Sequence, residues 1–225
     1  MTTFTPRLDI LPRPQQLIWP ELQEVSRGFV LYGGTAVVLH LGHRTSVDFD
    51  FFSSNDIDVD ECLSGLSRLG ARDVLQATEN TVTVLVDREG PIKLSFFGGI
   101  TMGRVATPLL TEDSVMLVAS RRDLLAHKLA TVYQRVEAKD YIDVAALLRD
   151  GGALRDGLES ALAFWPDLPV QDVLRALCYF QEGDFSTLGR DDRTLLVHAA
   201  RFVDLVGLAP AHLDNSRLDD GAVPA

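Results

Sequence analysis

The sequence predicts an α+β N-terminal half followed by an all-helical C-terminal half. Short apolar runs separated by turn residues recur up to about residue 118, which is typical of strands in a sheet. From Arg121 onward the spacing of apolar residues becomes helical and stays so. The 225 residues suffice for one large domain or two small ones. We therefore expect an α+β domain over residues 1–118 and a helical domain over residues 119–225.

Local patterns predict the elements of the N-terminal half. Gly33-Gly34 ends an apolar run, and Thr35 stands where a helix N-cap is expected. A turn cluster at 87–91 predicts a hairpin between the strands on either side of it. The helices expected here cover about residues 14–27, 36–41 and 58–69. The strands expected here cover about residues 29–32, 46–52, 74–75, 81–86, 92–97 and 115–118.

Helical periodicity organises the C-terminal half. The helices expected there cover about residues 121–136, 139–149, 153–164, 170–180 and 190–206. The tail from Leu213 is polar and acidic, and we expect it to be frayed.

Composition and charge exclude several classes of protein. Hydrophobic residues make up 46% of the chain, which indicates a globular protein. The net charge of −11 argues against a surface coated with phosphate-binding groups. Residues 121–139 are the exception, with five basic and two acidic side chains. They form either a solvated helix face or a local phosphate-binding strip.

The sequence also predicts where the protein resides. No apolar run approaches the roughly 18 residues that a membrane span needs. Residues 1–7 lack the apolar core of a signal peptide. Cys62 and Cys178 are far apart in sequence, which favours reduced thiols over a single disulfide. We expect a cytoplasmic protein that makes no membrane contact.

Asp48 and Asp50 stand two residues apart within the apolar strand pattern at 46–52. Side chains at i and i+2 of a strand point to the same face, so the two carboxylates project side by side. Val47, Phe49 and Phe51 then project to the other face. Two like charges this close need a compensating cation, and carboxylate oxygens are the ligands that Mg²⁺ and Mn²⁺ prefer. This strand is therefore a candidate metal site.

Gly33-Gly34-Thr35 follows a predicted strand and opens a predicted helix. Glycine lets the backbone approach a ligand closely, and a helix N-terminus attracts anions. Taken alone, the glycine pair is more simply a tight turn, and a D-x-D is common on protein surfaces. Along this sequence, however, one helix separates the candidate phosphate-binding turn from the carboxylate pair on the next strand. Phosphoryl and nucleotidyl transfer require a phosphate cradle and a bridging divalent metal.

The run LYGGTAVVLHLGHRTSVDFDFF at residues 31–52 closely resembles the AbiEii/AbiGii-type toxin family of nucleotidyltransferase-like proteins, within the DNA polymerase β superfamily. The resemblance implies a polymerase β-like core, in which helices flank a mixed sheet, followed by a helical bundle. It implies phosphate binding by Gly33, Gly34 and Thr35, nucleotide positioning by Arg44 and Ser46, and catalytic metal binding by Asp48 and Asp50. It also implies a nucleoside triphosphate as substrate with Mg²⁺ or Mn²⁺, an acceptor hydroxyl on RNA (including the tRNA acceptor end) or protein, and a cognate antitoxin.

A second block, around residues 122–143, resembles the K…R…KDxxD region of the same family. By this resemblance Lys128 and Arg135 contact the nucleotide phosphates, and Lys128 is also catalytic. The two are seven residues apart, so one helix face can carry both. Asp140 and Asp143 would orient these cations. The alternatives are a helix N-terminal charge for Asp140 and a structural salt bridge for Asp143.

One position departs from the superfamily pattern. These enzymes usually carry a third carboxylate on a later strand, which here is the one at about 92–97. Ser95 takes the expected position of that acid. A neutral hydroxyl is a poorer base and a weaker metal ligand than a carboxylate. Asp87 and Glu89 are nearby acids, but both lie in the predicted turn.

Three functional interpretations follow. The first is a metal-dependent nucleotidyltransferase, the toxin half of a bacterial toxin–antitoxin pair. The second is a catalytically silent nucleotide-binding or protein-interaction module on the same fold, which Ser95 favours. The third is a structural domain in which the acidic pair is incidental.

Overall fold

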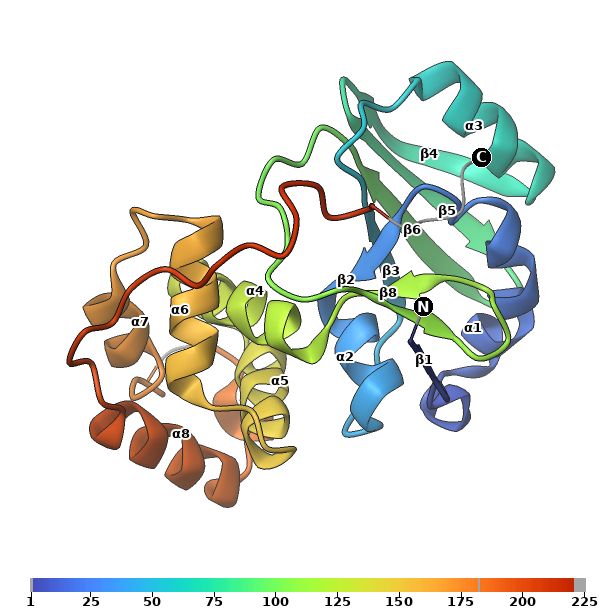
Figure 1. The fold of residues 1–225 in the computed structure, drawn as a ribbon. Coiled ribbons are helices and arrows are strands. Elements are labelled where there is room, and N and C mark those ends of the chain that lie inside the picture. The colour runs from blue at the N-terminus through green and yellow to red at the C-terminus, as the bar shows by residue number, and fades with distance from the viewer. Residues whose placement is uncertain (1, 182, 221–225) are drawn as a thin grey trace. The chain divides into compact units, whose positions relative to one another are not determined.

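The computed structural model of the protein describes residues 2–181 and 183–220, which form two compact units (Figure 1). The first unit comprises residues 2–103, 107–120 and 215–220. The second comprises residues 104–106 and the described part of 121–214. The strands of the described chain lie in the first unit, and helices α4 to α8 lie in the second. The predicted α+β class, with a helical C-terminal part, is confirmed.

The first unit is built on one mixed sheet of eight strands. The strands are β1 (Thr3–Phe4), β2 (Val30–Tyr32), β3 (Asp48–Phe52), β4 (Ala71–Thr78), β5 (Thr81–Asp87), β6 (Pro91–Phe97), β7 (Leu109–Thr111) and β8 (Leu117–Val118). Their order is β1-β7-β8-β2-β3-β6-β5-β4. The central strand β3 runs antiparallel to β2 and parallel to β6. The sequence did not predict β1 and β7, because two or three residues carry no alternating pattern.

Helices flank this sheet. They are α1 (Arg13–Ile18), α2 (Gly33–Leu41) and α3 (Val59–Arg68), with 3₁₀ helices at Leu8–Ile10 and Trp19–Glu24. Helix α2 packs on β2 and β3, and α3 packs on β4 and β5. The helix predicted up to about residue 27 stops at Ile18, because Pro20 cannot continue an α-helix. Thr35 lies within the first turn of α2, so the expected N-cap role is wrong and Tyr32 takes that position.

Strand β3 places Phe49 and Phe51 on one face and Asp48 and Asp50 on the other, as predicted. Phe49 and Phe51 are fully buried. The Phe51 ring stacks on Phe96 with centroids 4.9 Å apart, and Phe49 lies 6.4 Å from Trp19. Asp48 and Asp50, which alternate with these rings, are half-buried. Burial of the aromatic face therefore fixes the direction in which both carboxylates project.

The second unit is helical (Figure 1). Its helices are α4 (Arg121–Gln134), α5 (Ala138–Arg149), α6 (Leu154–Phe164), α7 (Val170–Ala176) and α8 (Arg190–Phe202), with a 3₁₀ helix at Phe185–Thr187. Helix α4 packs against α5, α6 and α7, and α5 packs against α8. Across the residues that the structure describes, no helix combines the length and apolarity needed to cross a membrane.

The tail expected to be frayed is ordered over residues 215–220, which lie in the first unit. Leu218 and Asp219 are buried. One carboxylate oxygen of Asp219 accepts hydrogen bonds from Ser53 Oγ at 2.9 Å and from Asn55 Nδ2 at 3.0 Å. The polar composition of the tail gave no sign of these partners, 164 or more residues away. Residues 221–225 of the predicted tail lie outside the described residues.

Replacing Asp219 by alanine is expected to loosen residues 215–220, because two buried hydrogen bonds to a carboxylate are lost. Trypsin cleavage after Arg217 should then become at least about tenfold faster, since that bond adjoins the buried Leu218. The measurement is the rate of limited proteolysis, followed by mass spectrometry. Asp172→Ala, which removes an exposed ion pair with Arg175, is the control. Equal cleavage rates in the two variants would contradict the structural role of the tail.

Candidate active site

The turn between β2 and α2 brings the backbone and a carboxylate into close approach. Gly33 has φ +71°, a left-handed conformation that favours glycine. A β-carbon at this position would lie 2.6 Å from Asp50 Oδ2. Only glycine therefore lets the Asp50 carboxylate lie against the start of α2 in this way. The sequence reasoning placed these two residues in one site, and the structure brings them together.

The next residue of the turn lies beside two further polar groups. A β-carbon on Gly34 would lie 2.5 Å from Arg44 Nη2 and 3.2 Å from Ser46 Oγ. The guanidinium and the hydroxyl thus occupy the space that a side chain would fill. Within the described chain, the N-cap residue Tyr32 gives the first turn of α2 no side-chain hydrogen bond. The turn therefore combines helix N–H groups with a guanidinium, a combination suited to an anion.

Thr35 is buried, and its hydroxyl connects α2 to the aspartate strand. It lies within hydrogen-bond distance of the Asp48 carbonyl oxygen and 2.8 Å from Ser46 Oγ. A hydroxyl has one proton, and the carbonyl can only accept. Thr35 therefore donates to Asp48 and accepts from Ser46. This side chain fixes the distance between the glycine turn and β3, while its predicted contact with a nucleotide stays a prediction.

Strand β6 supplies the side chains next to the aspartates. In the parallel β3–β6 pair, Asp48 is opposite Lys93 and Asp50 is opposite Ser95. Lys93 Nζ lies 2.9 Å from Asp48 Oδ2. Ser95 is buried, so a neutral hydroxyl does occupy the strand position beside Asp50. The sequence reasoning missed Lys93, although its i, i+2 spacing to Ser95 places both on one face.

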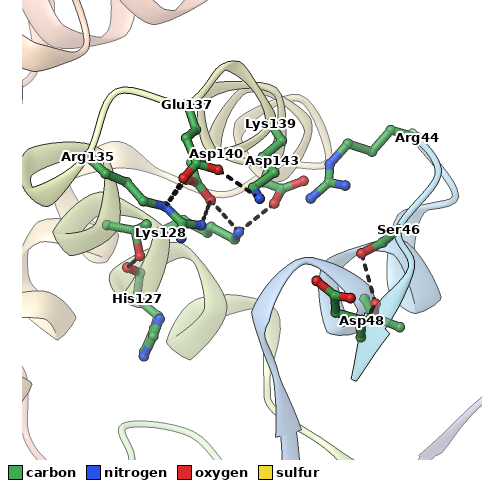
Figure 2. Close-up of polar contacts among 12 residues, drawn as sticks. Arg44, Ser46, Asp48, His127, Lys128, Arg135, Glu137, Lys139, Asp140 and Asp143 are labelled. Carbon is green, nitrogen blue, oxygen red and sulfur yellow. Dashed lines mark hydrogen bonds and ion pairs between the residues drawn. The ribbon is translucent and has the colours of Figure 1, made fainter. Parts of the chain in front are cut away.

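A second polar cluster lies within the second unit (Figure 2). Lys128 Nζ lies 2.7 Å from Asp140 Oδ1 and 2.7 Å from Asp143 Oδ2. Arg135 Nε lies 2.8 Å from Asp140 Oδ2. Both carboxylates are fully buried, and Lys128 is 4% exposed. Asp143 thus makes a salt bridge, and Asp140 lies in the first turn of α5 and also contacts both cations. Their orienting role toward a nucleotide stays a prediction.

Burial and the charges of this cluster shift the pKa values of Asp140 and His127. Burial raises the pKa of Asp140, but the hydrogen bond from Arg135 and the charge of Lys128 outweigh it and hold the pKa below 3.8. Ionised Asp140 therefore stabilises the fold at neutral pH, and this contribution is lost as the pH falls below about 4. Desolvation, followed by the charge of Lys128, lowers the pKa of His127 to about 4. The Trp165 ring makes an edge-to-face contact with the His127 ring, with centroids 5.5 Å apart.

We expect the free energy of unfolding to fall between pH 7 and pH 5, because His127 is neutral in the fold and becomes protonated in the unfolded chain. The loss should be on the order of 1–2 kcal/mol, since the unfolded pKa is about 6.5. Urea unfolding at several pH values measures it. In His127→Gln most of this slope should disappear, whereas His198→Gln on exposed α8 should keep it. An unchanged slope in His127→Gln would contradict the low pKa.

The basic side chains at 121–139 have ion-pair or hydrogen-bond partners within the second unit. Arg121 pairs with Asp150, and Arg122 donates to the Ser160 hydroxyl at 2.9 Å. Lys139 pairs with Glu137 at 2.7 Å. Lys128 and Arg135 have the acidic partners described above. Apart from the buried Lys128, these side chains are exposed, as expected for a solvated helix face, and the phosphate-binding strip stays a prediction.

The donor set of the first unit fits a hard divalent cation. Asp48 and Asp50 offer carboxylate oxygens from the same strand face. Because Gly33 has no β-carbon, Asp50 Oδ2 lies against the N-terminus of α2. A metal-bound phosphate could lie at the same helix end. No group of three or more His, Cys, Asp or Glu residues suited to a metal occurs in the described part of the chain. Two carboxylates are therefore the protein ligands that this site offers.

A family model and two similar proteins match this chain. Residues 21–176 match the model of the family described as nucleotidyl transferase AbiEii toxin, type IV TA system. An uncharacterized protein of Aquifex aeolicus (strain VF5) is 27% identical over 161 residues, covering 70% of this chain and 76% of that protein. A crystal structure of a candidate nucleotidyltransferase from H. pylori has a TM-score of 0.53 at 18% identity, covering 80% of this chain and 88% of that one. This structural likeness supports the fold.

Proposed function

We propose a function from the premise that this chain belongs to the AbiEii family of nucleotidyltransferase toxins. The proposed activity is metal-dependent nucleotidyl transfer, in which a nucleoside triphosphate modifies a hydroxyl acceptor. Gly33, Gly34, Arg44 and Ser46 would bind the nucleotide. Asp48 and Asp50 would hold Mg²⁺ or Mn²⁺.

One observation carries the proposal: the Asp50 carboxylate lies where a side chain at Gly33 would be. Packing alone does not require a glycine pair, a guanidinium and two carboxylates around one helix N-terminus. Phosphoryl chemistry does, because a triphosphate needs N–H donors and a cation bridging it to the protein. The bound metal would neutralise the triphosphate and polarise its oxygens.

The proposed reaction is a substitution at the α-phosphorus of the nucleotide. The acceptor oxygen bonds to the α-phosphorus of the nucleotide, the bond from that phosphorus to the bridging oxygen breaks, and pyrophosphate leaves. The hydroxyl proton needs an acceptor. Ser95 is a poor base, so a carboxylate of the Asp48–Asp50 pair is the stronger candidate on this strand face. Lys128 and Arg135 stay proposed phosphate contacts, supported by the family motif and by the aspartates that hold them.

Calorimetric titration with each nucleoside triphosphate in the presence of Mg²⁺ tests the binding step. Wild type should bind at least one nucleotide, and Asp50→Asn should lose most of the affinity while keeping the shape of the side chain. Asp87→Asn, at the exposed end of β5, is the matched control and should bind as wild type does. If neither wild type nor the control binds any nucleotide, the proposal fails.

Label transfer tests turnover and identifies the acceptor. The protein is incubated with cell extract and α-³²P-labelled nucleotide, and labelled RNA and labelled protein are separated. The fraction that carries the label, RNA (including tRNA) or protein, identifies the acceptor. Asp50→Asn should abolish the labelling.

A second candidate function is a catalytically silent nucleotide-binding module, which Ser95 in the place of an acid favours. Nucleotide binding without any label transfer would support it. Transfer that depends on Asp50 would dismiss it.

The family also suggests a biological setting, a type IV toxin with an antitoxin partner. We propose that expression of the wild-type chain slows bacterial growth and that Asp50→Asn does not. Growth curves after induction, with equal protein levels checked by immunoblot, measure this. Equal inhibition by both proteins would separate the toxicity from nucleotidyl transfer.

A further inference from the structure

We propose that Lys93 is a built-in counter-cation of the aspartate pair, and that the site consequently takes one divalent ion that competes with Lys93 for Asp48. This inference rests on the proposed function, because it concerns the same site. Lys93 stands on β6 directly opposite Asp48, and its ammonium lies 2.9 Å from Asp48 Oδ2. Both side chains are a little over one-third exposed, so water and ions reach them.

The charge balance of the site supports a single ion. The carboxylates of Asp48 and Asp50, the Lys93 ammonium and the Arg44 guanidinium beside the glycine turn sum to no net charge, so one divalent cation already makes the site positive. A third carboxylate would be needed to favour a second ion, and Ser95 stands at the strand position beside Asp50. The two acids also differ in their surroundings. Asp50 lies against the glycine turn, whereas Asp48 faces the lysine.

The chemistry of lysine makes this contact exchangeable. An ammonium is a compact point charge on a flexible stem, unlike the rigid fork of arginine. When a divalent ion takes Asp48, Lys93 can turn to a phosphate oxygen of the nucleotide that arrives with the ion. The free protein should therefore bind the metal weakly, and the metal–nucleotide complex more tightly. Lys93 is in this sense a positioning residue of the metal site.

Electron paramagnetic resonance of Mn²⁺ tests the inference without relying on activity. Free and bound Mn²⁺ are counted for wild type, Lys93→Met and Lys93→Arg, with and without a nucleoside triphosphate. In the absence of nucleotide, Lys93→Met should bind Mn²⁺ about tenfold more tightly than wild type, because a positive charge some 3–5 Å from the ion is removed. Lys93→Arg keeps the positive charge in a more rigid group, so it should bind Mn²⁺ no more tightly than wild type.

Lys139→Met is the matched control, since it removes one positive charge from an exposed ion pair in the second unit. It should leave Mn²⁺ affinity as in wild type. An unchanged affinity in Lys93→Met, or two ions bound per wild-type chain, would overturn the inference while leaving nucleotide binding intact. Absence of Mn²⁺ binding in wild type and Lys93→Met, with and without nucleotide, would instead overturn the proposed function.

Discussion

Replacing Lys128 by methionine is expected to lower the free energy of unfolding by about 3–5 kcal/mol. The substitution keeps an apolar stem of similar length but removes the ammonium between Asp140 and Asp143. Both carboxylates are fully buried, so each would lose a charged partner away from water. Arg135 still contacts Asp140, so that carboxylate keeps one of its two cations. Urea unfolding at pH 7 followed by circular dichroism measures the change.

Two further variants separate the buried charge from other effects of this substitution. Arg149→Met breaks an exposed ion pair with Asp192 and should cost no more than about 1 kcal/mol. Asp143→Asn added to Lys128→Met should recover part of the lost stability, because it removes a buried charge that has lost the Lys128 ammonium. A loss of less than about 1 kcal/mol in Lys128→Met would show that the cluster is not the buried ion network described above.

Replacing Gly33 by alanine is expected to weaken binding of the nucleotide with Mg²⁺ by more than about tenfold. Two causes combine. A left-handed conformation costs an alanine about 1–2 kcal/mol, and the new β-carbon would lie 2.6 Å from Asp50 Oδ2. Relief of that contact requires the carboxylate or the turn to move, and both belong to the proposed site. Calorimetric titration gives the affinity, and thermal unfolding gives the accompanying loss of stability.

Gly28→Ala is a matched control, because Gly28 also has a positive φ, +76°, but a β-carbon there would meet nothing within 4 Å. It should lose similar stability from backbone strain and keep nucleotide affinity. Equal affinities in Gly33→Ala and Gly28→Ala would mean that the approach of Asp50 to the turn has no role in binding.

The parts of the fold that follow from periodicity were predictable. Alternation in β3 was enough to place Phe49 and Phe51 in the core and the two aspartates together on the opposite face. The glycine turn and strand β3 were predicted to form one site, because glycine lets the backbone approach a ligand closely and carboxylates bind divalent metals. The predicted helix boundaries in the second unit lie within a few residues of the observed ones, since apolar spacing there is regular.

Contacts between distant parts of the chain were not predictable from a single sequence. Lys93 meets Asp48 only through the parallel pairing of β3 with β6, and pairing partners leave no local pattern. The order of residues 215–220 depends on Asp219 meeting Ser53 and Asn55 in the same way. The basic excess near Arg121 is visible in the sequence, but the pairing of Arg121 with Asp150 is not.

The proposed site is tested most directly by diffraction from crystals soaked with a nucleoside triphosphate and Mn²⁺. Anomalous scattering locates the ion independently of the rest of the density. We expect one Mn²⁺ peak within coordination distance of the Asp48 and Asp50 carboxylates, with the phosphates of the nucleotide on the Gly33–Gly34 turn. A fully occupied nucleotide bound elsewhere, with no manganese at the aspartate pair, would contradict it.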